Sequence, residues 1–368
     1  MHPQRKKRQK RKLTPIGWAL VFILLLIIFF IIYGFCSCIA GTDSEEKSDS
    51  SEPTKTVTLT TKEPDPEPQK IELFSNDNAE DLDISSKNGI LVSLDSNEIV
   101  AQKNGNKKIY PASMTKVMTL LVAAENATSL DDTFTYTAEL IDPLFLEGAT
   151  MAGFKHDETV TVRDMIYGTV LPSGADAATG LAIKTAGSVE AFVALMNEKA
   201  KELGLENTHF VNTSGLHDPN HYSTCYDMAV IMKAAMENDV CREVLTAIDY
   251  TTSATPQNPE GIHLASTMFQ KIYGNEAENV EILAGKTGYT SEAGCCLVSF
   301  AQNINGKSFI LVSSQAGSQW GGIYDAIYTY AKYAGTKTVY LPVENSGPTH
   351  YVYKDITTEN ADYSYFNN

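Results

Sequence analysis

The feature that most constrains this 368-residue chain is an uncharged, apolar run close to its N-terminus. Residues 14–42 carry no charged side chain, and residues 16–36 are almost wholly apolar. A helix of about 20 such residues crosses a bilayer, where irregular backbone would leave costly unpaired polar groups. Seven Lys and Arg residues and no acidic residue occupy residues 1–13. By the positive-inside rule, the sequence predicts a cytoplasmic segment 1–13, a transmembrane signal-anchor 14–36 and a remainder outside the cytoplasm.

Two other interpretations of this run stay open. A cleaved signal peptide is one, although the apolar part of a signal peptide is usually only 7–15 residues long. Lipid attachment at Cys36 or Cys38 is the other, although the residues before both cysteines fit an attachment site poorly.

Residues 37–80 are predicted to be a linker, rich in Ser, Thr, Pro and acidic residues. Proline favours extended backbone and like charges repel, so the segment acts as a spacer. After residue 13 the chain carries 22 Lys and Arg against 45 Asp and Glu, a formal net charge of −23. Nucleic-acid binding is excluded as a function, because it needs a basic surface to neutralise phosphates.

Residues 81–336 are predicted to form one folded domain, followed by a C-terminal tail 337–368 that contains one more strand at 338–343. Hydrophobic periodicity and turn residues define the other elements. Strands are expected within 88–102 as a hairpin and at 280–285, 294–302 and 308–313; helices are expected at 113–124, 164–167, 176–184, 189–203, 227–238 and 322–333. This order predicts an α+β fold, in which both ends of the domain form one antiparallel sheet flanked by helices, with a helical subdomain inserted between them.

The spacing of the cysteines and histidines matches no metal-binding motif. Cys225, Cys241 and the pair 295–296 show no disulfide or zinc pattern and are expected to be buried free thiols. His217 and His221 are four residues apart, but Pro219 lies between them, so a helix that presents both to a zinc ion is not expected.

A candidate nucleophile and base occur in residues 111–116, Pro-Ala-Ser-Met-Thr-Lys. On a helix Ser113 and Lys116 share one face, and a lysine of lowered pKa can remove the proton of a serine hydroxyl. The Ser-x-x-Lys pattern alone is weak evidence, because residues 44–47 of the linker also match it.

Two further short motifs follow in the chain. Ser173 precedes a predicted helix, where a serine most often caps the helix, but it is also a candidate proton relay. Residues 285–289 read Gly-Lys-Thr-Gly-Tyr. Lys286 and Thr287 can bind a carboxylate, and Gly288 allows a substrate backbone to approach closely.

Taken together and in this order, the three motifs resemble the signature of serine β-lactamases and penicillin-binding proteins. The domain resembles the low-molecular-mass D-alanyl-D-alanine carboxypeptidases, peptidase family S11, over about 250 residues. Other stretches of the chain are similar to that family as well: residues 192–210, 215–216, 221–224 and 293–298.

The resemblance implies a DD-peptidase-like fold and a serine carboxypeptidase that removes the terminal D-alanine of peptidoglycan stem peptides and is acylated by penicillin. Ser113 would attack the carbonyl of the penultimate D-alanine, Lys116 would take its proton, and Ser173 would pass a proton to the departing D-alanine. Lys286 and Thr287, with Gly288 beside them, would hold the terminal carboxylate. The backbone N–H groups of Ser113 and Tyr289 would form the oxyanion hole. The resemblance implies no cofactor or metal. The implied partners are D-Ala-D-Ala stem peptides, β-lactams and, through the N-terminal helix, the bacterial cell membrane. The oligomeric state is left open.

One position departs from the family pattern. The family usually has Ser-x-Asn where this chain has Ser173, Gly174 and Ala175, and Asp176 is not an obvious substitute. We expect slower or altered catalysis from this change. Two rival functions remain, a β-lactamase and a penicillin-binding protein that senses peptidoglycan with little catalysis. The C-terminal tail is too short for the family's usual C-terminal β-domain.

Overall fold

The computed structural model describes residues 74–272, 274, 277, 279–334, 338–342 and 351–355, with side chains placed in 79–272, 274, 277 and 279–334. These residues belong to one compact unit, Asp65–Asn368. The predicted segments 1–13 and 14–36 lie outside the described residues. Of the helices in the described part, none alone has the length and apolarity to cross a membrane; Ala175–Ala186 and Val189–Glu202 pass that test only together, with an 85° bend between them.

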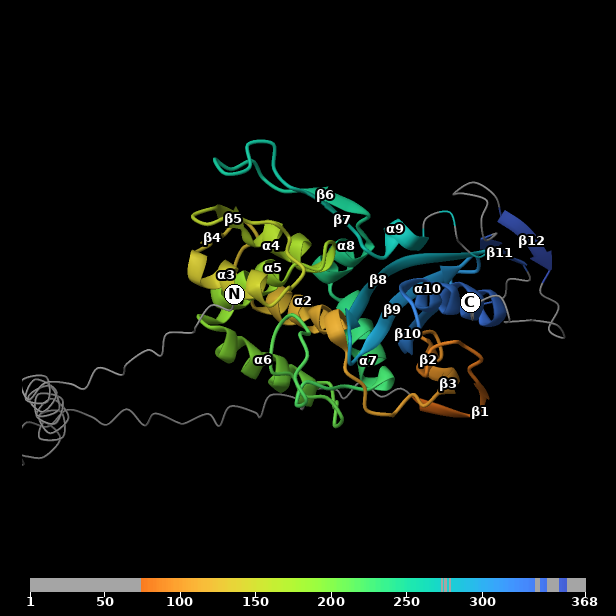
Figure 1. The fold of residues 1–368 in the computed structure, drawn as a ribbon. Coiled ribbons are helices and arrows are strands. Elements are labelled where there is room, and N and C mark those ends of the chain that lie inside the picture. Colours follow the sequence, from red (N-terminus) through yellow and green to blue (C-terminus); the bar gives the residue numbers. More distant parts are fainter. Residues whose placement is uncertain are drawn as a thin grey trace, which may run out of the picture. The chain divides into compact units, whose positions relative to one another are not determined.

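A six-stranded sheet is the framework of the domain, and both ends of the domain contribute to it (Figure 1). Its strands are β1 (Phe74–Asp81), β2 (Asn88–Ser93), β3 (Glu98–Lys103), β8 (Val280–Thr290), β9 (Gly294–Asn303) and β10 (Ser308–Ala316), in the order β1-β3-β2-β10-β9-β8. The predicted strands are confirmed, but the prediction of a purely antiparallel sheet is wrong, because β1 pairs with β3 in parallel. The chain crosses from β1 to the other side of β3 before it enters β2, and Ser85 and Ser86 hold this crossing by donating to the Asp325 carboxylate.

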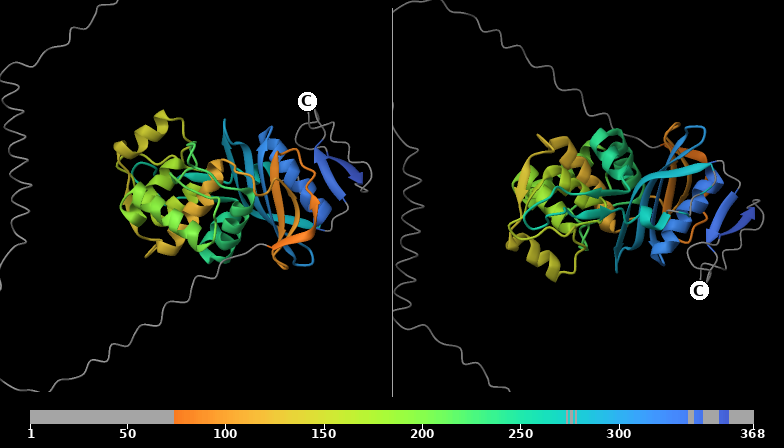
Figure 2. Two further views of the ribbon diagram at one scale, coloured as in Figure 1. Left: turned by 90° about the horizontal axis from the view of Figure 1, so that it is seen from below. Right: turned by 90° about the horizontal axis from the view of Figure 1, so that it is seen from above.

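Helices cover both faces of the sheet (Figure 2). Alternate residues of a strand point to opposite faces, so neighbouring residues enter different cores. Ile90 and Val92 pack in the core beneath the inserted helices, whereas Leu91 packs with Ile323 and Tyr330 of α10 (Gln319–Tyr333) in the core on the other face. The sheet therefore divides the domain into two hydrophobic cores.

The predicted helical insertion between β3 and β8 is confirmed. Its elements are η1 (Ala112–Met114), α2 (Thr115–Asn126), β4 (Thr133–Thr135), α3 (Ala138–Leu146), β5 (Thr159–Thr161), α4 (Val162–Val170), α5 (Ala175–Ala186), α6 (Val189–Glu202), α7 (Cys225–Glu237), α8 (Asp239–Thr246), β6 (Asp249–Thr251), β7 (His263–Ala265) and α9 (Phe269–Ile272). Every residue of α2 from Thr115 to Ala123 is buried, so this helix is the centre of the insertion. Packed residues therefore enclose the first turn of α2, which directly follows Ser113.

The structure also bears on the predictions for the cysteines and for the C-terminal tail. Cys225, Cys241, Cys295 and Cys296 are buried and free, as expected. The predicted strand in the tail is confirmed as β11 (Thr338–Pro342), which pairs with β12 (Tyr351–Asp355).

Candidate active site

Ser113 and Lys116 meet at the junction of η1 and α2. The Lys116 Nζ donates to Ser113 Oγ at 3.1 Å and to the backbone carbonyl of Ser214 at 2.7 Å. Lys116 is 2% exposed, and burial lowers the pKa of its ammonium from 10.5 to about 7, against the attraction of Asp176, which raises it. A substantial fraction of this lysine is therefore neutral at pH 7, the form in which it can accept the serine proton.

Two glycines allow the backbone around Ser113 to pack tightly. A Cβ on Gly288 would lie 2.9 Å from the backbone nitrogen of Ser113, and one on Gly215 would lie 1.8 Å from the carbonyl oxygen of Ala112. Ala112 itself has a φ of 46°, which is uncommon for a residue with a side chain. The close approach that Gly288 provides is thus to the protein's own nucleophile segment, a role that the sequence did not indicate.

Ser173 lies at the turn into α5, but it does not cap the helix. The N-cap is Gly174, and no side chain caps this helix end. Ser173 is 7% exposed with a φ of 69°, and its buried hydroxyl has no partner within the described residues. Burying a hydroxyl without a hydrogen-bond partner destabilises the folded protein, and strained or unsatisfied residues of this kind cluster at functional sites.

Ala175 and Asp176 hold a neighbouring loop in place. The Ala175 N–H donates to the Thr150 carbonyl at 2.7 Å, and the Asp176 carboxylate accepts from the N–H groups of Ala152, Gly153 and Phe154 at 2.7, 3.0 and 3.3 Å. The backbone of this loop therefore holds the Asp176 carboxylate, which is not among the residues that line the cavity. The methyl group of Ala175 offers no hydrogen bond.

Lys286 and Thr287 occupy different positions relative to the cavity. Lys286 is 1% exposed, its Nζ donates to the backbone carbonyl of Thr287 at 2.9 Å, and it is not part of the cavity wall. Its burial, followed by the nearby positive charges of Lys116 and Lys271, holds its pKa well below the usual value. The Thr287 hydroxyl lines the cavity and is hydrogen-bonded to the Thr267 hydroxyl at 2.8 Å.

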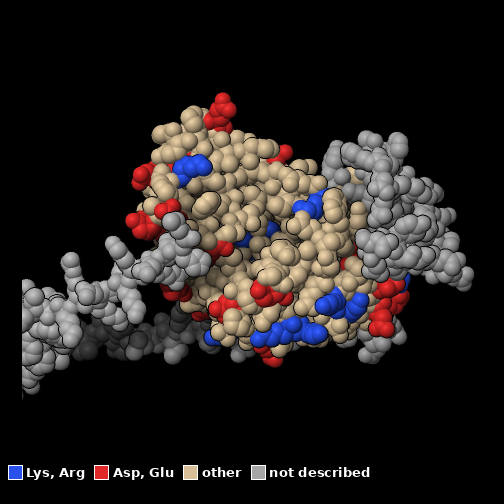
Figure 3. Space-filling view, in the orientation of Figure 1, with Lys and Arg blue, Asp and Glu red and all other residues tan. Residues whose placement is uncertain are grey.

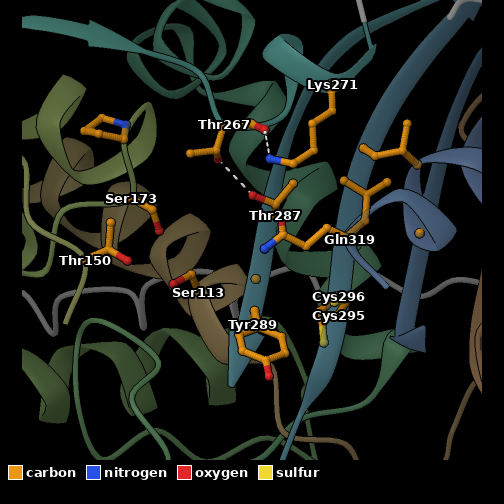
Figure 4. A pocket seen from close by; sticks show the side chains of 15 residues that line it. Ser113, Thr150, Ser173, Thr267, Lys271, Thr287, Tyr289, Cys295, Cys296 and Gln319 are labelled. Atoms are coloured by element: carbon orange, nitrogen blue, oxygen red, sulfur yellow. Dashed lines mark hydrogen bonds between the residues drawn. The ribbon is translucent and has the colours of Figure 1, made fainter. Parts of the chain in front are cut away.

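A cavity of about 230 Å³ lies between Ser113, Ser173 and Thr287 (Figure 4). The space-filling view shows this face hollowed between the helical insertion and the sheet, with Lys or Arg atoms inside the hollow (Figure 3). The lining residues are Ser113, Thr150, Pro172, Ser173, Thr267, Lys271, Thr287, Gly288, Tyr289, Cys295, Cys296, Leu297, Gln319, Gly322 and Ile323. β8 is the last strand in the sheet order, so its edge at this cavity is free for an additional strand among the described residues.

The sequence motifs did not point to several lining residues, among them Thr150, Thr267 and Lys271. Lys271 donates to the Thr267 carbonyl at 3.0 Å, and burial lowers its pKa. These residues have no motif of their own, and only the contact of the insertion with β8 brings them to Ser113. Their placement gives the cavity a cation that Lys286 does not present directly.

The two histidines of the predicted loop have structural roles. His221 is 2% exposed; its Nδ1 accepts from the Val211 N–H at 3.1 Å, so its Nε2 carries the proton and donates to Thr115 Oγ1 at 2.7 Å. His217 packs edge-on against Tyr110, with 4.7 Å between the ring centroids. Both nitrogens of His221 are engaged in tying the first turn of α2 to the loop that carries Ser214.

Comparisons with known proteins show the family of the chain. The family model for D-alanyl-D-alanine carboxypeptidase, peptidase family S11, matches residues 75–317. The D-alanyl-D-alanine carboxypeptidase DacF of Bacillus subtilis is 32% identical over 228 residues, which cover 62% of this chain and 57% of the relative. DacC of Escherichia coli is 33% identical over 226 residues, 59% of this chain and 54% of the relative. The chain thus spans little more than half the length of these curated relatives.

Solved structures give the same result. The crystal structure of the Streptomyces K15 DD-transpeptidase has a TM-score of 0.62 and 28% identity, covering 68% of this chain and 98% of that one. Penicillin-binding protein 5 from Haemophilus influenzae has a TM-score of 0.61 and 26% identity, covering 68% and 70%. The matched family model covers well over half of the chain and includes every residue of the cavity from Ser113 to Leu297. This chain therefore belongs to the D-alanyl-D-alanine carboxypeptidase family, peptidase family S11.

Proposed function

We propose that the protein is a serine-type D-Ala-D-Ala carboxypeptidase that removes the terminal D-alanine from peptidoglycan stem peptides. The observation that carries this proposal is the 3.1 Å contact between Lys116 Nζ and Ser113 Oγ, with a Lys116 pKa of about 7. A buried amine of this pKa beside a hydroxyl is suited to general-base catalysis near neutral pH. Membership of the family supplies the substrate class.

Acylation begins with neutral Lys116. Its Nζ takes the hydroxyl proton of Ser113 while Oγ forms a bond to the carbonyl carbon of the penultimate D-alanine. The negative charge moves to the carbonyl oxygen, which the backbone N–H groups of Ser113 and Tyr289 would stabilise. In comparable enzymes, one such donor contributes about 2.7–4 kcal/mol to the transition state. Gly288 is the residue of β8 that approaches the backbone nitrogen of Ser113, and this close approach next to Tyr289 supports the proposal.

The leaving group departs when the C–N bond breaks. Its nitrogen needs a proton, and the Lys116 ammonium now has one to give. The unpartnered hydroxyl of Ser173 is suited to relay that proton. Water then attacks the acyl-enzyme, Lys116 takes a proton from the water, and the proton returns to Ser113 Oγ as the C–O bond breaks.

The substrate would be held as an added strand beside β8. Its terminal carboxylate would meet the Thr287 hydroxyl, with Lys271 on the cavity wall and the buried Lys286 side chain behind the wall. The positive charge of Lys271 would offset the cost of removing the carboxylate from water. The same carboxylate site and the same acylation would serve penicillin, whose acyl-enzyme has no leaving group that diffuses away.

We also propose that residues 14–36 anchor the protein in a bacterial cell membrane by a single helix, with the catalytic domain outside the cytoplasm, where peptidoglycan lies. The sequence of basic residues 1–13, apolar residues 16–36 and the acidic linker supports this arrangement.

The test is release of D-alanine. The domain from residue 74 onwards is incubated with a diacylated Lys-D-Ala-D-Ala peptide beside the Ser113→Ala variant, and D-alanine is measured enzymatically. Release by the wild type that disappears in Ser113→Ala is the expected result. No release by the wild type, with penicillin still attached to Ser113, would favour the alternative of a penicillin-binding sensor. Rapid turnover of penicillin would favour the alternative of a β-lactamase.

A further inference from the structure

We propose that Thr150 is a substrate-binding residue that this chain uses on the cavity wall opposite β8. Its hydroxyl donates a hydrogen bond to the amide carbonyl that precedes the penultimate D-alanine of the stem peptide. The inference rests on the proposed function, but its test has a readout that does not depend on D-alanine release.

Thr150 differs from the two serines of the cavity wall in its exposure to solvent. It is solvent-exposed and lines the cavity together with Ser113 and Ser173. Figure 4 shows its hydroxyl oxygen on the side that faces these two serines. The insertion also contributes Pro172 to this part of the wall. Ser113 is the nucleophile and the buried Ser173 hydroxyl is assigned to proton transfer, so among the described residues the exposed Thr150 hydroxyl is the side-chain group of this wall that is left for the substrate backbone.

The backbone of the loop that carries Thr150 is fixed. The Thr150 carbonyl accepts from the Ala175 N–H at 2.7 Å, and Asp176 accepts from Ala152 and Gly153 two and three residues further on. A Cβ on Gly174 would lie 2.7 Å from the backbone nitrogen of Ala152, so the loop and the start of α5 are in close contact. A hydroxyl on such a loop binds with little loss of conformational entropy.

An extended peptide needs partners on two edges. Backbone groups of a strand alternate between its edges, so a substrate paired with β8 on one side turns its other carbonyl groups toward the insertion. A carbonyl that loses water there without a new partner weakens binding. Ala175 has no polar side-chain atom, and the Asp176 carboxylate is occupied by the loop. Thr150 supplies the missing donor.

A double-mutant cycle tests this assignment. The variants are Thr150→Val, which keeps the shape and removes the hydroxyl, Thr150→Ser, which keeps the hydroxyl, and Ala175→Asn, which adds an amide at the residue whose N–H donates to the Thr150 carbonyl. Thr133→Val, at an exposed threonine in β4, is the matched control. Two rates are measured for each variant: kcat/KM for D-alanine release and the acylation rate with a fluorescent penicillin, which carries an equivalent side-chain amide. Melting temperatures show that each variant is folded.

We expect Thr150→Val to lower both rates roughly tenfold, the effect of one lost hydrogen bond. Thr150→Ser should lose less than about threefold, and Thr133→Val should match the wild type. In the Ala175→Asn background, Thr150→Val should cost less than about threefold, because the amide takes over the carbonyl. Equal rates for Thr150→Val and the wild type, or the same tenfold loss with and without Ala175→Asn, would overturn the assignment. Absence of D-alanine release from the wild type would overturn the proposed function instead, while the acylation rates would still decide on Thr150.

Discussion

Replacing Lys116 with methionine should abolish acylation and, at neutral pH, should not destabilise the fold. Burial lowers the Lys116 pKa from 10.5 to about 7. This shift of about 3.5 units corresponds to about 5 kcal/mol of free energy against the charged form. Methionine removes that cost and fills the same space, but it leaves the Ser214 carbonyl without its donor, a loss of about 1–3 kcal/mol. The net effect is a domain that is as stable as the wild type or more stable, and inactive.

The pH dependence separates these two contributions. Between pH 7 and 10.5 the unfolded wild type binds a proton at Lys116 that the folded protein does not. The stability of the wild type relative to Lys116→Met therefore rises with pH, by about 1.4 kcal/mol per unit between pH 7.5 and 9.5.

Guanidinium unfolding of both proteins at pH 7.5, 8.5 and 9.5 measures this difference. Groups common to both proteins cancel in the subtraction, so the slope reports on Lys116. Parallel stability curves across this range would refute the argument, because they would mean that Lys116 keeps an ordinary pKa in the folded protein. A penicillin acylation rate in Lys116→Met close to that of the wild type would refute its role as the base.

Three further changes test other parts of the site. Ala175→Asn should raise the acylation rate by penicillin, and an unchanged rate, measured by stopped flow, would show that Ala175 does not limit catalysis. Gly288→Ala should reduce acylation by at least about a hundredfold, because its Cβ would lie 2.9 Å from the Ser113 nitrogen; a normal rate would mean that this contact is not tight. Burial lowers the His221 pKa from 6.5 to about 4. The stability that neutral His221 contributes, about 3 kcal/mol, is present above pH 6.5 and lost as the pH falls to 4; an acid unfolding curve that is identical in His221→Phe would contradict this.

The long elements of the fold could be predicted because their patterns are local. β9 and β10 are continuous apolar runs, and α6 shows one apolar face. Most of the short elements could not be predicted, since three-residue strands such as β4 and β6 have no measurable periodicity. β1 was missed for another reason: its sequence is polar and acidic like a linker, and its place in the sheet comes from pairing with β3.

The residues of the site likewise differ in whether the sequence could predict them. Ser113 and Lys116 are three residues apart, so helix geometry alone predicts their contact. Thr150, Thr267 and Lys271 have no motif, and the cavity acquires them through tertiary packing. Lys286 was expected at the substrate carboxylate, yet its side chain lies behind the wall, because β8 presents Thr287 to the cavity. The sequence motif thus identifies the strand, and the structure adds that Thr287 lines the cavity while Lys286 does not.

The most direct test of the account is the pH dependence of kcat/KM for D-alanine release from a diacylated Lys-D-Ala-D-Ala peptide. The central claim is that neutral Lys116 activates Ser113. The account predicts a rate that rises tenfold per pH unit on the acid side and levels off with a midpoint near 7, the Lys116 pKa. A midpoint above 9, or a rate that does not change between pH 5 and 9, would contradict it.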